Sequence, residues 1–133
     1  MTALTHDRNT PRREAFDFSF PVAAGKRIFT GAAVVIQADG FAAPGTTATG
    51  LKSVGIAQEA VDNRDGGNGA ARVRVRRGCF AMKQGADHVT LADAWSPCYL
   101  VDDQTIAKTD GAGTRSQAGI VRDVDSAGVW VEF

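Results

Sequence analysis

The sequence has few of the features that mark metal-binding, secreted or membrane proteins. It has only two cysteines, Cys79 and Cys98, which are far apart and have no histidine nearby. This spacing fits no zinc motif and predicts free, buried thiols. No apolar run approaches the roughly 18 residues that a membrane span needs, so we expect no membrane partner. The N-terminus lacks the apolar core of a signal peptide, and we expect the protein to be made and kept in the cytoplasm.

Catalytic motifs are missing as well. Neither His6 nor His88 lies beside a serine or cysteine in a known nucleophile motif, and there is no phosphate-binding loop and no dinucleotide fingerprint. The loop from Asp62 to Gly69 is rich in oxygen donors, but it lacks the bidentate glutamate that ends a calcium loop, so we interpret it as a hairpin loop. We therefore expect a protein that is not an enzyme and that uses no metal or cofactor.

An excess of charge of either sign is absent too. The chain has 15 Lys or Arg and 15 Asp or Glu residues, which cancel. No overall field attracts the protein to nucleic acid or to an anionic membrane, and we expect no nucleic-acid partner. Any basic site must be local.

The residues that are present favour β-structure. Fifteen glycines stand beside only four leucines, and no stretch of ten or more residues has helical periodicity. Short β-branched runs alternate with turn residues instead. At 133 residues the chain is long enough for one domain with its own core. The predicted fold is all-β, a compact small β-barrel or sandwich over residues 21–133, preceded by an extended N-terminal arm at 1–20.

Two hairpin patterns in the chain resemble each other. The first is Val54–Val61, the loop Asp62–Gly69 and Arg72–Val75; the second is Ala118–Val124, a turn and Val129–Phe133. A shift of 64 in residue number carries Gly55 onto Gly119 and Val34–Ile36 onto Cys98–Leu100, and after the first arm the shift falls to 56. The spacing predicts that the domain consists of two similar β-units, at about 25–82 and 85–133.

The arm is predicted as a partner-binding segment. Its beginning, at positions 1–13, is mostly polar, whereas Phe16, Phe18 and Phe20 recur at period two and share one face of an extended segment. These phenylalanines form either the first core strand or a surface that docks on a neighbouring subunit. With Arg12 and Arg13 they make up the candidate contact residues of the arm.

A second candidate site is the strand that contains Arg72, Arg74 and Arg76. Alternation places these three side chains on one face, with Val73 and Val75 on the other. The arginines either pair with acidic residues of a neighbouring strand or bind carboxylates of a protein partner. Phosphates are the third possibility, but the neutral net charge and the lack of interleaved aromatic residues argue against nucleic acid.

Several of these segments together resemble a known family. They are the Val54–Ala57 arm followed by an acidic residue, the basic strand that ends in Gly78–Phe80, the segment Trp95–Leu100 and the closing Ala118–Val121 with its Val-x-Val ending. Over about Val22 to Phe133 this pattern resembles the head decoration, or capsid cement, proteins of tailed bacteriophages. The loop Asp62–Gly69 has no counterpart in that pattern.

The resemblance implies a β-barrel-like structural protein without catalytic residues. Such a protein is made in the host cytoplasm and attaches to the exterior of the expanded capsid, often as homotrimers, where it stabilises the shell against the pressure of the packaged DNA. The partners that it implies are the major capsid protein and other copies of the chain. The N-terminal arm would pair with the capsid surface, and removal of residues 1–20 would leave the domain folded.

Two other functions remain open at this point. One is a small ligand- or carbohydrate-binding β-domain, or a barrel enzyme, with Trp95, Tyr99 and Trp130 as stacking surfaces. The other is a tail or baseplate adaptor, which would differ from a decoration protein in copy number.

Overall fold

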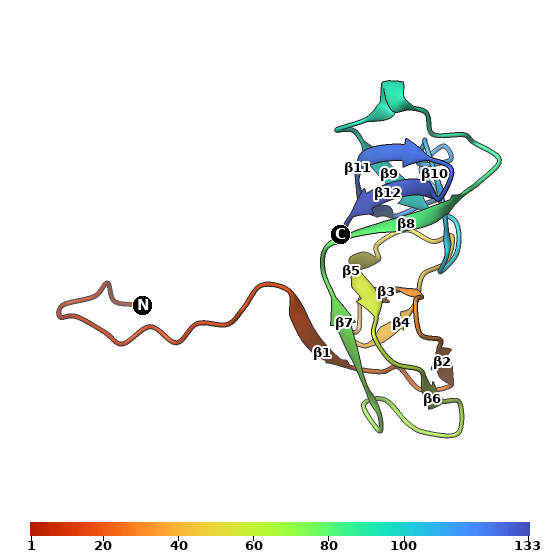
Figure 1. Ribbon diagram of the computed structural model, residues 1–133. Helices are drawn as coiled ribbons and strands as arrows, with labels where there is room; N and C mark the ends of the chain where they lie inside the picture. The colour runs from red at the N-terminus through yellow and green to blue at the C-terminus, as the bar shows by residue number, and fades with distance from the viewer.

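The structure is a computed structural model that describes residues 1–133, and it confirms the predicted fold class. Two β-units are stacked on each other, and an extended N-terminal segment runs away from the lower unit (Figure 1). No helix has the length and hydrophobicity needed to cross a membrane. The elements are β1 (Asp17–Pro21), β2 (Lys26–Ile28), β3 (Ala33–Ile36), β4 (Ala42–Pro44), β5 (Lys52–Ala57), β6 (Val61–Asn63), β7 (Arg72–Arg76), β8 (Cys79–Gln84), the 3-10 turn η1 (Leu91–Asp93), β9 (Pro97–Leu100), β10 (Thr105–Ala107), β11 (Gln117–Asp125) and β12 (Gly128–Glu132).

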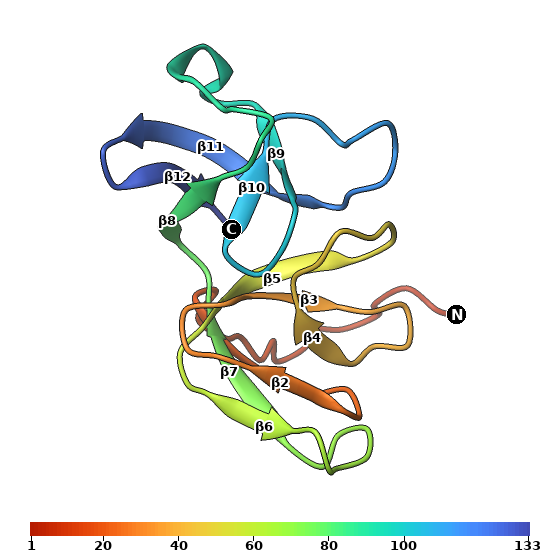
Figure 2. The ribbon, with the colours of Figure 1, turned by 90° about the vertical axis from the view of Figure 1, so that its right-hand side faces the viewer.

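The two units have the same topology. The second is a closed barrel in the order β10-β8-β12-β11-β9. The first has the sheet order β1-β7-β5-β3-β4, and a parallel bridge between Val22 and Ala42 joins its two edges. The strands of the two units correspond in chain order: β1, β3, β4, β5 and β7 of the first match β8, β9, β10, β11 and β12 of the second. With this correspondence, each strand has equivalent neighbours in both units. Figure 2 shows the second unit above the first, with β5 at their junction.

Strand pairing repeats at the spacing found in the sequence. Val34 pairs with Gly55 in the first unit, and their equivalents at a shift of 64, Cys98 and Gly119, pair in the second. A register shift follows at the same place in both units. Ala57 of β5 pairs with Val75 of β7, and its equivalent Val121 of β11 pairs with Val131 of β12. Val75 and Val131 are related by the second shift of 56.

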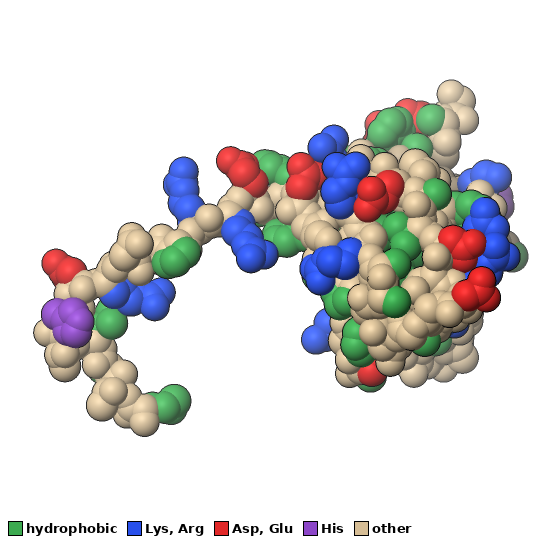
Figure 3. All heavy atoms as spheres, turned by 90° about the horizontal axis from the view of Figure 1, so that it is seen from below, with side chains coloured by type: hydrophobic (Ala, Val, Ile, Leu, Met, Phe, Trp, Pro, Cys, Tyr) green, Lys and Arg blue, Asp and Glu red, His purple; other side chains and the backbone are tan.

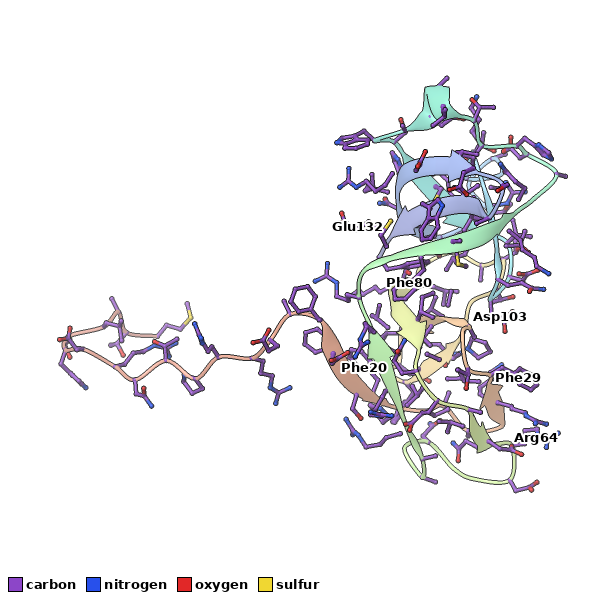
Figure 4. The ribbon with its side chains drawn as sticks, viewed as in Figure 1. Phe20, Phe29, Arg64, Phe80, Asp103 and Glu132 are labelled. Carbon is purple, nitrogen blue, oxygen red and sulfur yellow. The ribbon has the colours of Figure 1, made fainter.

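The boundaries of the units differ from those expected at 25–82 and 85–133. Phe18 of β1 pairs with Val75, and Phe80 of β8 pairs with Val131, so β1 and β8 are equivalent first strands. Figure 4 shows Phe20 in the lower unit and Phe80 at the base of the upper one. The first unit therefore begins at Asp17, and the second begins at Cys79 and not after Met82. The sequence pattern does not reveal this, because β1 and β8 are related by a third spacing that matches neither of the other two shifts.

The first predicted hairpin is interrupted in the structure. β5 ends at Ala57, and Val61–Asn63 forms β6, which pairs with β2 outside the main sheet. The buried Asn63 side chain donates hydrogen bonds to the carbonyl oxygens of Val22, Ala23 and Gly67 at 3.0–3.2 Å. This amide holds the following loop against the first unit, a constraint that local turn propensity does not reveal.

One of the two core clusters spans both units, and the other lies within the first unit. Ala33, Val35 and Ile56, on the outer face of the first unit, are at most 5% exposed because they pack in one cluster with the interior of the second. At this junction the Ala33 amide donates to the Asp103 carbonyl oxygen at 2.8 Å. Burial, and secondarily the charge of Asp102, raises the pKa of the Asp103 carboxyl above its ordinary value.

The two cysteines differ in environment. Cys98 lies in the core of the second barrel, and burial raises the pKa of its thiol to about 12. Cys79 is exposed, against the expectation that both thiols are buried, because it lies on the outward face of β8. Partial desolvation raises the pKa of the Cys79 thiol as well.

Candidate interaction site at the arm and the arginine strand

The segment predicted as an arm has two structurally different parts. Met1 to Phe16 forms no strand, is exposed throughout and extends away from the barrels (Figure 1). Phe18 and Phe20 instead belong to β1, where they pair with Val75 and Val73 and are half-buried. Phe16 remains 60% exposed. The free arm is therefore residues 1–16, tied to the first sheet only at its last residue, where the Arg77 amide donates to the Phe16 carbonyl oxygen at 2.7 Å; residues 17–20 are part of that sheet.

The arginines of β7 lie on one exposed face, and each has a partner within the first unit. Arg76 forms a two-bond pair with Asp17 at 2.8 and 3.3 Å, and this interaction holds the pKa of Asp17 below its ordinary value. Arg74 pairs more loosely with Glu59 at 3.4 Å. Arg72 donates to the Ser19 hydroxyl and carbonyl oxygens. The Arg74 and Arg76 side chains are still 68% and 53% exposed, so their guanidinium groups can bind further acceptors.

The structure brings parts of both predicted sites to one groove. This groove has a volume of about 520 Å³ and lies where the arm meets β1 and β7. Phe18 is its one apolar wall; the other lining residues are Arg13, Asp17, Ser19, Gln58, Arg74 and Arg76. Figure 3 shows basic side chains along the arm and at its root. Arg12, Phe16, Phe20 and Arg72 do not line the groove.

Three guanidinium groups line this groove, and the two carboxylates beside them, Asp17 and Glu59, leave a local excess of one positive charge. Arg13 forms no ion pair within the chain, whereas Asp17 is engaged by Arg76. Guanidinium groups favour carboxylates, to which they donate two parallel hydrogen bonds. The groove is thus suited to an acidic segment of a protein partner.

The aromatic residues of the ligand-binding alternative do not converge. Tyr99 lines a cavity of about 300 Å³ to which neither tryptophan contributes. The Trp130 indole donates to Asp125 at 2.9 Å on the outer face of β12. Trp95 is 71% exposed, and its ring lies 4.7 Å from the Arg122 guanidinium. No group of three or more His, Cys, Asp or Glu side chains is placed to hold a metal ion.

Trp95 has an unusual backbone conformation, which the repeat explains. Its equivalent in the first unit is Gly31, and the amides of both residues donate to equivalent carbonyl oxygens, those of Val121 and Ala57. The φ angles are 88° at Gly31 and 67° at Trp95. Positive φ is strained for a bulky residue, so glycine at position 95 would lower the backbone strain. A strained, exposed tryptophan is typical of a residue retained for a contact.

We expect glycine to be more stable than alanine at position 95. Trp95→Ala removes the cation–π contact and keeps the left-handed strain, whereas Trp95→Gly removes both. The glycine variant should therefore exceed the alanine variant by about 1 kcal/mol in unfolding free energy. Urea titrations of the two variants measure this difference, and equal stability would show that the backbone there is unstrained.

Comparison of the chain with protein-family models, with curated proteins and with solved structures finds no match.

Proposed function

We propose that this protein is a structural virion protein, a decoration or cement protein that binds the outer surface of a tailed-phage capsid. The observation that carries the proposal is the free arm, residues 1–16, which is wholly exposed and continues directly into a strand of the first sheet. The resemblance of the sequence to capsid cement proteins supports the same function. The partners would be the major capsid protein and other copies of the chain.

The physical argument concerns what the arm does for its own fold. Its residues belong to neither core cluster, and its backbone contact with the sheet is the hydrogen bond from the Arg77 amide to the Phe16 carbonyl oxygen, so the fold depends on it little. An extended segment of this length spans up to roughly 50 Å and can lie along a neighbouring protein or add a strand to an exposed sheet edge. Ordering such a segment costs conformational entropy, which its contacts with a partner must exceed.

Attachment of many copies then stabilises a shell. Each arm adds a modest contact area, but a shell offers the same contact at every equivalent position. The two packed β-units form the body that the arm holds in place.

Quantitative mass spectrometry of purified phage particles tests this function. Particles of the phage or prophage that encodes the chain should contain it in a large fixed ratio to the major capsid protein, near one or another simple fraction. A few copies per particle would indicate a tail or baseplate adaptor instead. Absence from particles would refute a virion role and favour the ligand-binding alternative.

A further inference from the structure

The neutral net charge of the chain conceals a strong separation between its two units. Residues 1–78 contain 11 Lys or Arg and 7 Asp or Glu, a formal charge of +4. Residues 79–133 contain 4 and 8, a formal charge of −4. The arm and the first unit are therefore basic, and the second unit is acidic.

The acidic charge of the second unit is largely unpaired. Its three ion pairs engage Asp87, Asp93 and Glu132. The other five carboxylates form no ion pair within the chain; they are Asp102, Asp103, Asp110, Asp123 and Asp125. The acidic edge, defined as Asp123 and Asp125, lies on the outward face of β11, where both residues are exposed.

The repeat shows why Asp123 lacks a cation. Its equivalent in the first unit is Glu59, which pairs with Arg74 of β7. The residue that replaces Arg74 in β12 is Trp130, and it lies opposite Asp123. The carboxylate that has a basic partner in the first unit is therefore left without one in the second.

Hydrogen bonds hold the acidic edge in a defined orientation. Asp125 accepts bonds from the Ala127 amide at 2.8 Å and from the Trp130 indole at 2.9 Å, and Asp123 accepts a bond from the Val124 amide at 2.8 Å. Because both carboxylates are on alternate residues of a strand, they are about 7 Å apart along the chain direction. Arg74 and Arg76, on alternate residues of β7, have the same spacing.

We propose that the acidic edge of one copy binds the basic groove of a second copy, where Arg13, Arg74 and Arg76 gather. The occupant is another copy of this chain because a single chain carries both complementary surfaces, with matching spacing and opposite charge. The contact is head-to-tail, since the two surfaces belong to different units, and it leads to a ring or a filament according to its rotation. It concerns contacts between copies, so it can fail or hold independently of a role on a phage shell.

The test is self-association of the full-length chain, measured by sedimentation velocity at low and high salt. We expect association that weakens as salt screens the charges. Two variants reverse one surface each: Asp123→Lys with Asp125→Lys, and Arg13→Glu with Arg74→Glu. Each variant alone should associate at least about tenfold more weakly than the wild type. An equimolar mixture should form 1:1 complexes, because the first variant keeps the basic groove and the second keeps the acidic edge.

Controls separate this contact from effects on folding and on total charge. Arg13→Glu alone changes no residue of the sheet, and it should also weaken association while thermal unfolding stays unchanged. Asp102→Lys with Asp110→Lys alters the charge of the second unit by the same amount away from the acidic edge and should associate like the wild type. A wild type that is monomeric at every concentration and salt overturns the proposal. So does a mixture of the two variants that stays monomeric, or a charge control that loses association equally.

Discussion

Deletion of residues 1–16 is expected to abolish attachment to phage particles while both barrels stay folded. The deleted residues are exposed and belong to neither core cluster, and the deletion removes one exposed backbone hydrogen bond, from the Arg77 amide to the Phe16 carbonyl oxygen. The melting temperature should therefore change by no more than about 2 °C, since surface changes alter stability by roughly 0.5 kcal/mol or less. Incubation of the truncated protein with particles that lack it, followed by sedimentation and mass spectrometry, measures attachment.

Deletion of residues 1–20 is the matched comparison, because it also removes most of β1. The first sheet then loses Phe18 and Phe20, which pair across the strands with Val75 and Val73. Arg76 also loses its ion pair with Asp17. Loss of two half-buried phenylalanines and of an edge strand should cost several kcal/mol and lower the melting temperature by roughly 10 °C or more. Attachment retained after removal of residues 1–16 would contradict the role of the arm, and unfolding caused by that removal would show that the arm belongs to the fold.

Substitution of either bulge glycine is expected to be strongly destabilising. Gly55 and Gly119 occupy equivalent positions opposite Val34 and Cys98. A Cβ atom at Gly55 would lie 2.5 Å from the Arg76 carbonyl oxygen, and φ there is 136°. At Gly119 a Cβ would lie even closer to the Glu132 carbonyl oxygen. Since backbone must move in both cases, alanine at either position should cost about 2–4 kcal/mol, or roughly 10 °C in melting temperature.

Gly67→Ala is the control for this prediction. No atom lies within 4 Å of a Cβ at Gly67. The alanine variant should therefore unfold within about 0.5 kcal/mol of the wild type. Differential scanning calorimetry of the three variants measures these differences in melting temperature. An unchanged melting temperature for Gly55→Ala or Gly119→Ala would contradict the close approach of the strands.

These glycines also show which features of the fold could be predicted from the sequence. A shared shift of 64 between Gly55 and Gly119 predicted two similar β-units, and the pairing register reproduces that shift residue by residue. Turn residues predicted the reversal between β11 and β12. Such features are local, because a bulge glycine or a tight turn is required by the backbone of a few neighbouring residues.

The candidate site was predictable only in part. The period-two pattern placed Arg72, Arg74 and Arg76 on one face, as the structure has them. It did not reveal that Asp17 and Glu59 lie beside them, or that Arg13 completes a groove with Arg74 and Arg76. These residues come from β1, from the segment after β5 and from the arm, and nothing in their spacing indicates that they meet.

The sequence by itself determined the all-β class, the two-unit repeat and the extended arm, since these follow from periodicity, turn residues and local polarity. Only the tertiary structure decided that Phe18 and Phe20 belong to the sheet while the Phe16 side chain is exposed. It also decided that β8 opens the second unit and that the outer face of the first unit is buried beneath it. The physical reason is that burial and pairing depend on which surfaces meet across long sequence separations, and a strand pattern specifies the surface but not its partner.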